Sequence, residues 1–599
     1  MIQAAGHDEI YLLLNGTKYH IHHPSWMGQN GYGDAKIHVL TEAEVQAIPT
    51  GYPLPEGAGV PGRPGAAAAL EGRLLAGDDG RVYIVMRGER HWVLDGRWIA
   101  ESRYAGQGPI SLTDSQLAEV PLGGDLYYQT VGAKIALWLC AAAIFLFLQQ
   151  KVGQASACQA VQWRGRPTLR SAFAAIFIAA IALREPYLLQ HPRFWAEEGF
   201  VWFQYASSHS LVQSIFFVNP LSTYFNLAIN VAAILSAIVA ARFGLEYAPL
   251  VTTIYAFAIQ ALAIVLILFC KSRLFDSTWK AVAGCLIVLF AATSKDELWL
   301  NTTNSMSFLG LIALLLLFVE MEDWPAWARW GERVLLLICG LSSPYATPLL
   351  PLFAIAAWRS KEREQKIQCL ILGVCLLVQV GSVVKTRREL VRHGRDTLRG
   401  MKVQWDASAI NVFCEQMLLP AVGAATREGV LDKTGLKEAW TSAASFPPRP
   451  VTHAMRVGGC FCLMLIVGIL ALLRGPTLFS VANQLIGVFL ILAPFTCLTA
   501  LYAVPTNRYA FLPGFTFLLL LLLKAEDGQS RAARYGSMAV LAYGLAAGMV
   551  MYQTPKFQEG PSWQKEVNLW RENPAHPLRV WPPSTDPNGG FLYKPNTKR

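Results

Sequence analysis

Two adjacent carboxylates, Glu197 and Glu198, lie in FWAEEGFVWF, just beyond an apolar stretch long enough to cross a membrane. Aromatic residues such as Trp195 surround the pair, and Arg184 and Arg193 precede it. An aromatic environment at a membrane interface raises carboxylate pKa values, which suits a general base, and aromatic faces also stack on sugar rings. We predict that Glu197 and Glu198 are catalytic and that Arg184, Arg193 and Trp195 bind substrate. Solvated loop acids without a function are the alternative.

A second polar cluster lies in SKDELWLNTTNSMSF and contains Asp296, Glu297, Asn301 and Asn304. The spacing predicts that Glu297, Asn301 and Asn304 share one face of a helix. Amides and carboxylates bind sugar hydroxyls or orient a metal, and polar groups beside an apolar span are costly without partners. We therefore predict that these four residues bind substrate, with a capped helix end in the head-group layer as the alternative.

Basic residues supply seven of the eighteen positions in KTRRELVRHGRDTLRGMK, 385–402. Arginine binds phosphate oxygens through two parallel hydrogen bonds, so the phosphate of a lipid carrier is the natural partner of Arg387, Arg388 and Arg392. Arg508, in PTNRYAFLP, is a fourth candidate for phosphate binding. A surface helix on anionic lipid is the alternative for the basic segment.

The elements that must position these residues are membrane helices. Hydrophobic residues make up 53% of the 599 positions and charged residues 15%, against about 25% charged residues in soluble domains. Apolar stretches of spanning length recur from Val131 onward, which predicts a mostly α fold, a polytopic membrane helical bundle of about twelve spans over 131–552. The net charge of +10 then suits loops and lipid head groups, and we expect no nucleic-acid partner.

The spans are predicted at 131–150, 171–190, 250–270, 281–294, 305–320, 333–344, 346–358, 366–384, 455–473, 479–503, 508–524 and 535–552. Basic residues mark one side as cytoplasmic, in the segments 151–170, 271–280, 359–366 and 524–534. The outer loops are then 191–249 and 385–454, with 207–242 at the membrane interface, followed by a Trp/Pro-rich outer tail at 553–599. We predict a multi-pass protein of a bacterial inner membrane whose site faces the periplasm or the outside. No secretory signal is expected in MIQAAGHDEIY, which lacks a basic region and an apolar core.

We predict that residues 1–130 form an α+β domain of two tandem repeats, 1–54 and 82–130, joined by a Gly/Ala/Pro-rich linker at 55–81. A shift of 72 positions aligns IYLLLNGTKYHI with VYIVMRGERHWV, and LTEAEVQAIPTG with LTDSQLAEVPLG. Each copy predicts a β-hairpin and then a short helix capped by Thr41 or Thr113. Binding of a glycan, an envelope polymer or a partner and a purely structural role both stay open.

The ordered strings REP…FWAEEG, DELWLNTTN, RYAFLP and W…V..W…P resemble a bacterial branch of the GT-C superfamily of integral-membrane glycosyltransferases, over roughly residues 170–585. The resemblance implies transfer of a sugar, with inversion, from a polyprenyl-phosphate donor to an envelope glycan or protein acceptor. It implies that Glu197, in preference to Glu198, deprotonates the acceptor hydroxyl. The neighbouring acid would hold the geometry or a divalent cation, Mg²⁺ or Mn²⁺.

The same resemblance assigns the leaving phosphate to Arg387, Arg388, Arg392 or Arg508. The N-terminal repeats and the additional first span depart from the family's plan and leave the acceptor open. A lipid-linked polysaccharide polymerase or ligase is one alternative, and it would not need the paired acids. A lipid or glycan transporter or flippase is another, although such proteins usually show internal repeats and charged or broken helices at mid-membrane depth.

Overall fold

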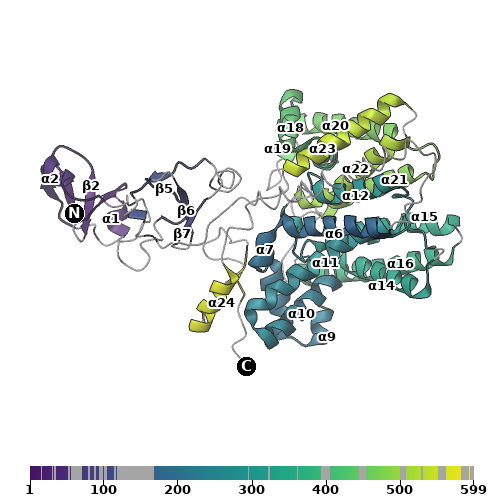
Figure 1. Ribbon diagram of the computed structural model, residues 1–599, viewed down its shortest axis with the longest axis horizontal. Coiled ribbons are helices and arrows are strands. Elements are labelled where there is room, and N and C mark those ends of the chain that lie inside the picture. The colour runs from purple at the N-terminus through teal and green to yellow at the C-terminus, as the bar shows by residue number, and fades with distance from the viewer. Residues whose placement is uncertain are drawn as a thin grey trace. The chain divides into compact units, whose positions relative to one another are not determined.

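The computed structural model describes residues 1–120, 167–550, 562–581 and 592–593. Within these ranges it leaves out 15–16, 24, 30–31, 33–34, 51–53, 55–69, 79–80, 87–88, 94–98, 100–103, 105, 114–115, 118–119, 221, 294–295, 322–323, 361, 393–404, 444–452, 500–506 and 528–529. The chain divides into two units, Met1–Thr130 with Thr554–Gly560 and Val131–Gln553 with Pro561–Arg599 (Figure 1). The predicted span 131–150 lies outside the described residues.

The first unit contains two four-stranded sheets. In one sheet β1 (Ile2–Ala4), β2 (Ile10–Leu14), β3 (Thr17–Ile21) and β4 (His38–Leu40) lie in the order β3-β2-β1-β4. In the other β5 (Leu74–Ala76), β6 (Val82–Met86), β7 (Glu89–Trp92) and β8 (Ile110–Ser111) lie in the order β7-β6-β5-β8. The predicted hairpins are present as the antiparallel pairs β2–β3 and β6–β7. The parallel pairs β1–β4 and β5–β8 are additions that the sequence did not predict.

The two sheets share their hairpin register. Tyr11 pairs with His20, and Tyr83 pairs with Trp92, so both members of each pair differ by the offset of 72 seen in the sequence. Because a shift of one residue would move every side chain to the other face of the sheet, the shared register places equivalent side chains on equivalent faces of the two hairpins.

Both predicted threonine caps are formed. Thr41 and Glu44 make a reciprocal capping box at the start of α2 (Glu42–Gln46). Thr113 and Gln116 exchange the same two bonds, from the backbone N–H of each residue to the side chain of the other. The short helix α1 (Ser25–Gln29) precedes β4.

The linker predicted at 55–81 ends earlier than expected. Leu74 and Leu75 are buried in β5, which pairs with β6 and β8, so these residues belong to the second sheet. The strand is only three residues long and shows no apolar–polar alternation, so its sequence gives no strand signal beside the Gly- and Ala-rich run. Both sheets contribute to one core, with buried side chains from Leu12, Trp26, Leu54, Leu70, Leu75, Tyr83, Val85 and Leu112.

The second unit is mostly helical, and helices lie in every predicted span from 171–190 onward. They are α6 (Pro167–Arg184), α7 (Pro186–Gln190), α8 (Gln204–Ser208), α9 (Leu211–Ile215), α10 (Leu227–Phe243), α11 (Ala248–Phe269), α12 (Thr278–Phe290), α13 (Ser305–Leu316), α14 (Ala326–Ser342), α15 (Leu350–Ser360), α16 (Arg363–Arg392), α17 (Trp405–Asn411), α18 (Leu419–Thr434), α19 (Leu436–Ala443), α20 (His453–Leu473), α21 (Val481–Thr499), α22 (Phe511–Asp527), α23 (Arg531–Val550) and α24 (Trp563–Glu572). Among the described residues, two π-helices connect some of these helices, η3 (Glu198–Phe203) and η7 (Val412–Leu418). Four short 3₁₀ segments do the same, η4 (Leu245–Tyr247), η5 (Asp296–Leu298), η6 (Thr347–Leu349) and η8 (Asn507–Ala510). Two short strands, β9 (Leu578–Arg579) and β10 (Leu592–Tyr593), follow α24.

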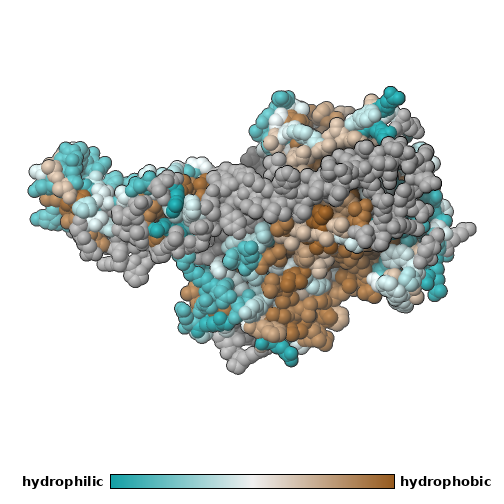
Figure 2. All heavy atoms as spheres, in the orientation of Figure 1, coloured by the Kyte–Doolittle hydropathy of each residue, from teal (hydrophilic) through white to brown (hydrophobic). Residues whose placement is uncertain are grey.

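Several helices could cross a membrane. Within the described residues, five are long and apolar enough: Leu245–Phe269, Arg363–Leu390, Trp405–Thr434, His453–Leu473 and Arg508–Glu526. The pair Ala326–Ser342 and Thr347–Ser360, bent by 114°, would make six, and four further apolar helices are shorter. Apolar side chains gather on one face of the helical unit in Figure 2, and Ile238 of α10 and Ile254 of α11 are among the exposed ones.

The helices of this unit run between two opposite ends. At one end Arg184, the last residue of α6, donates to the carbonyl oxygen of Leu289 in the last turn of α12. At the other end Lys280, in the first turn of α12, forms an ion pair with Glu526 near the end of α22. We call these the Arg184 end and the Lys280 end. In Figure 1, α7 and α18 lie toward the first, and α15 lies toward the second.

One candidate span, Trp405–Thr434, lies inside the predicted outer loop 385–454. Asp406 packs against Gly459 in the first turns of α20, and the Gln416 amide donates to the Thr496 hydroxyl, 2.9 Å away, in the last turns of α21. Gln484, at the start of α21, lines one cavity with Lys271 and Arg273, which precede α12, so the last turns of α21 and the first turns of α20 lie at the Arg184 end. The segment is thus a helical layer at the Arg184 end, where the sequence predicted a loop.

Candidate functional site

The paired acids lie at the start of a π-helix that the preceding residues position. Pro186 begins α7, because proline lacks an N–H and is tolerated in the first helical turn. Ala196 then adopts a left-handed φ of 40°, a conformation that costs a non-glycine residue about 1–2 kcal/mol. This turn makes Glu197 the N-cap of η3 and Glu198 its first residue. Strained residues and π-helices are both concentrated at functional sites.

The Glu198 carboxylate is enclosed by the protein, with 2% of the residue exposed. Its Oε2 accepts a 2.8 Å hydrogen bond from the backbone N–H of Trp195. Its Oε1 accepts from the backbone N–H of Thr302 and from the Thr302 hydroxyl, 2.5 Å away. Burial raises the pKa of Glu198 to about 7, and these hydrogen bonds oppose the rise. Glu198 therefore joins the paired-acid loop to the 296–304 segment, and a catalytic role for it stays a prediction.

Replacing Glu198 by glutamine should destabilise the protein by about 2 kcal/mol, because an amide offers one acceptor oxygen to donors that occupy two. Wild-type stability should fall as pH rises from 4.5 toward 7, since the unfolded chain releases this proton near 4.5 and the folded chain keeps it to about 7. In the glutamine variant this contribution to the pH dependence of stability should be absent. Thermal unfolding of the detergent-purified protein between about pH 5 and 8 measures both effects. If stability depended on pH equally in wild type and variant, the raised pKa of Glu198 would be contradicted.

Glu197 is half-buried, and a different set of charges surrounds it. Arg508, in η8, interacts with the neighbouring Tyr509 and is attracted electrostatically by Glu297 and, more weakly, by Glu197. Its Nη1 lies 3.9 Å from Oε2 of Glu297, and the two side chains keep 21% and 22% of their surface exposed. Three distant parts of the sequence therefore bring two carboxylates and one guanidinium to a partly open place, which we call the acid–arginine cluster (Glu197, Glu297 and Arg508).

The segment 296–304 is not the helix with one polar face that the spacing predicted. It starts with the 3₁₀ turn η5, reverses at Leu300 with a φ of 54°, and ends where α13 begins. The side-chain amides of Asn301 and Asn304 are buried and donate to the backbone oxygen of Glu297, at 2.7 and 2.5 Å. Both amides thus stabilise the turn formed by the segment. The prediction that Glu297, Asn301 and Asn304 share one face of a helix is wrong. The side chain of Asp296 lies outside the described residues.

Thr302 was not among the predicted site residues, although it binds Glu198 through both its N–H and its hydroxyl. The signal was present in LWLNTTN, a polar run beside an apolar span. A hydroxyl there needs a partner once it is buried, and a carboxylate elsewhere in the chain is such a partner.

The two arginines before the acids are buried, with 2% of Arg184 and 6% of Arg193 exposed. Nη1 of Arg184 donates to the backbone oxygen of Leu289 at 2.7 Å, which joins α6 to α12. The Arg193 guanidinium lies over the rings of Tyr187 and Trp581, 5.2 Å from each ring centre. Their present contacts support the loop, and substrate binding by either residue stays a prediction.

The C-terminal tail packs against the paired-acid loop. The ring of Trp581 lies 4.6 Å from the ring of Trp195, and its backbone oxygen accepts from the N–H of Ala196. The ring of Trp563, in α24, meets Phe194 edge-on at 5.1 Å. Trp195 is therefore covered on one side by the tail, and the tail forms part of the support of the acids.

Gly199 allows this close approach. A Cβ atom at this position would lie 2.8 Å from Cγ2 of Val580 and 3.1 Å from Cβ of Phe194, and both neighbours are buried. Replacing Gly199 by alanine should therefore destabilise the protein by about 1–3 kcal/mol and expose the tail to protease. Gly429→Ala is the matched control, because a Cβ there meets nothing within 4 Å. Thermal unfolding and limited proteolysis compare the two, and equal behaviour would contradict tight tail packing.

The basic segment 385–402 begins as helix, not loop. α16 continues to Arg392, so Arg387, Arg388 and Arg392 are exposed on its last turns. Cations at this position interact favourably with the helix dipole, which favours helical continuation. Of the four predicted phosphate-binding arginines, Arg508 is the one that lies beside Glu297, within electrostatic range of Glu197, among the described residues.

Both oxygens of Glu198 accept hydrogen bonds, from Trp195 and Thr302, with which a divalent cation there would compete. Over the part of the chain that the structure describes, no three His, Cys, Asp or Glu side chains form a metal-binding group. Mg²⁺ or Mn²⁺ at Glu197 stays a prediction.

No protein-family model matches the sequence, and no characterised protein matches it. The acid–arginine cluster itself is therefore the basis for a functional conclusion.

Proposed function

We propose that the protein is a GT-C-like membrane glycosyltransferase that uses a polyprenyl-phosphate sugar and acts on the periplasmic or outer face of a bacterial inner membrane. One observation carries the proposal: Arg508 lies 3.9 Å from Glu297 and within electrostatic range of Glu197, although the three residues come from the separate strings FWAEEG, DELWLNTTN and RYAFLP. A half-buried carboxylate beside a partly exposed guanidinium suits a reaction that removes a proton and releases a phosphate.

In the proposed reaction Glu197 accepts the proton of the acceptor hydroxyl. The acceptor oxygen forms a bond to the anomeric carbon of the sugar, while the bond from that carbon to the phosphate oxygen breaks. Attack from the face opposite to the phosphate inverts the configuration. Arg508 stabilises the negative charge that remains on the carrier phosphate. Glu198 acts through Glu197, because it fixes the loop that carries both acids.

We propose about twelve spans, with the acid–arginine cluster outside. Two sets of contacts support this sidedness. The paired-acid loop, the 296–304 segment and the tail, all predicted outside, touch one another through Glu198, Thr302 and Trp581. Lys280 and Glu526, which adjoin predicted cytoplasmic loops, meet at the opposite end.

The N-terminal unit is proposed to contain two copies of one module that selects or tethers the acceptor. The equal strand order and equal hairpin register of the two sheets support the duplication. The acceptor is proposed to be an envelope glycan or protein.

The proposal is tested with the full chain in nanodiscs and polyprenyl-phosphate sugars extracted from bacterial membranes, by measuring carrier-phosphate release. Release coupled to sugar transfer supports it. Growth of a lipid-linked polysaccharide would favour the polymerase or ligase. Binding of a lipid-linked glycan without turnover would favour a transporter or flippase.

A further inference from the structure

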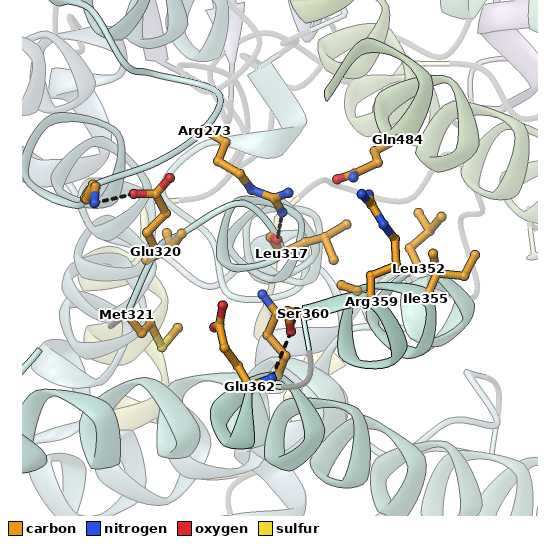
Figure 3. Close-up of a pocket in the computed structure, with 14 residues that line it drawn as sticks. Arg273, Leu317, Glu320, Met321, Leu352, Ile355, Arg359, Ser360, Glu362 and Gln484 are labelled. Atoms are coloured by element: carbon orange, nitrogen blue, oxygen red, sulfur yellow. Dashed lines mark hydrogen bonds and ion pairs between the residues drawn. The ribbon is translucent and has the colours of Figure 1, made fainter. Parts of the chain in front are cut away.

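A second polar site lies at the Lys280 end of the bundle. It is a cavity of about 440 Å³ whose lining includes Lys271, Arg273, Glu320 and Arg359 (Figure 3). Lys271 is already neutralised, because its Nζ lies 2.6 Å from Oε2 of Glu320. The two arginines point into the same space in Figure 3.

Arg273 is held in place by the end of α13. Its Nη2 donates to the backbone oxygen of Leu317 at 3.1 Å, and its backbone N–H donates to the oxygen of Phe318 at 3.0 Å. These bonds satisfy carbonyl groups that a helix end leaves unpaired. The bond to Leu317 uses one of the five guanidinium N–H groups of Arg273, and the other four remain for a ligand in the cavity.

Arg359 enters the cavity from α15, with its guanidinium 4.0 Å from the centre of the Phe479 ring. Over the described residues, neither Arg273 nor Arg359 has a carboxylate within 4.0 Å, the limit for an ion pair. Glu320 and Glu362 attract Arg273 from a longer distance, and Arg359 repels it. Glu362 also lines the cavity, so the lining carries three cations and two carboxylates, and the remaining positive charge favours an anionic ligand.

The cavity also has an apolar side. Leu352 and Ile355 of α15 line it, and Ile355 is 41% exposed at the surface. Gln484, from the start of α21, adds an amide on the polar side. The volume lies within the range of about 300–1,000 Å³ typical of small-molecule sites.

From this geometry we propose that Arg273 and Arg359 form a binding site for a phosphate ester, either the head group of an anionic lipid or a soluble phosphate compound. Guanidinium groups bind phosphate oxygens through paired, charge-assisted hydrogen bonds, and a phosphate ester has enough oxygens to bind both guanidinium groups at once, whereas a halide offers no paired acceptors. The site is separate from the acid–arginine cluster, because α13 extends about 18 Å between them. It does not depend on the proposed glycosyl transfer.

The test is native mass spectrometry of the full detergent-purified chain, titrated separately with inorganic pyrophosphate and with phosphatidylglycerol. Wild type should bind one molecule of at least one probe. Arg359→Gln should weaken that binding about tenfold or more, because it removes the charged partner of the phosphate. Arg363→Gln is the matched control: it changes the same charge nearby, on an exposed residue outside the cavity lining.

A second variant keeps both arginines. Ala356→Phe places a ring in the cavity that Ala356 lines, so it should also abolish the one-to-one binding. Pyrophosphate binding lost in both cavity variants identifies a soluble ligand, and phosphatidylglycerol binding lost in both identifies a lipid head group. Binding of neither probe by wild type, or equal weakening by Arg359→Gln and Arg363→Gln, overturns the proposal.

Discussion

Replacing Glu197 by glutamine should lower the rate of carrier-phosphate release by about 10²–10⁴-fold while the protein stays folded. Glutamine has nearly the same volume as glutamate but cannot accept a proton from the acceptor hydroxyl. Glu197 is half-buried and supplies no hydrogen bond on which the loop depends among the described residues, so its loss should cost little stability. The measurement is turnover of a polyprenyl-phosphate sugar by equal amounts of folded wild type and variant in nanodiscs.

The matched control is Glu246→Gln, which removes one negative charge from the same end of the bundle. Glu246 forms an ion pair with Arg571 of α24 and, among the described residues, none with Arg508. It should keep turnover within about twofold, because a half-exposed ion pair contributes little. Full activity of Glu197→Gln would exclude Glu197 as the base and favour the polymerase or ligase reaction.

Adjacent identical residues such as Glu197 and Glu198 cannot be distinguished by pattern alone. The sequence predicted a catalytic pair, but the fold encloses one carboxylate and leaves the other partly open. What decides between them is the positive φ of Ala196 and the position of Thr302, which lies 104 residues away along the chain. Such a contact depends on tertiary packing: the polar run LWLNTTN indicates that a buried hydroxyl there needs a partner, but it does not indicate which carboxylate is that partner.

Local patterns were predicted well where local bonds decide the structure. The hairpins and the caps of Thr41 and Thr113 depend on residues only a few positions apart. The polar run at 296–304 was predicted as a helix because its spacing is helical. Its amides instead bind the backbone oxygen of Glu297, which stabilises a turn.

The same reasoning explains the arginines. A cluster of basic residues at 385–402 is conspicuous in the sequence, whereas Arg508 is a single cation in an apolar stretch. In the structure the single arginine is the one near the predicted site, because η8 brings Arg508 to Glu297. The basic cluster lies on exposed turns of α16, which carry Arg387, Arg388 and Arg392. A lone cation near apolar helices is costly without a partner, and that cost is the physical signal for function.

Replacing Arg508 by glutamine should therefore lower the rate of sugar transfer by about 10²–10³-fold, the usual effect of removing one donor that stabilises charge in a transition state. Arg508→Lys should recover part of the loss, because it keeps the charge but not the paired N–H groups that match a phosphate. The rate is measured with saturating donor, so that weaker donor binding does not mimic a slower reaction.

The matched control for Arg508 is the triple variant Arg387→Gln, Arg388→Gln and Arg392→Gln, which removes three charges from exposed helical turns. If Arg508 holds the leaving phosphate, the triple variant should keep most of its maximal rate, and its effect should be confined to donor binding at low ionic strength. The opposite result, with transfer lost in the triple variant and kept in Arg508→Gln, would move the phosphate to the end of α16. The Glu197 base would then need a substrate that reaches from η3 to α16, and the acid–arginine cluster would be a structural ion pair.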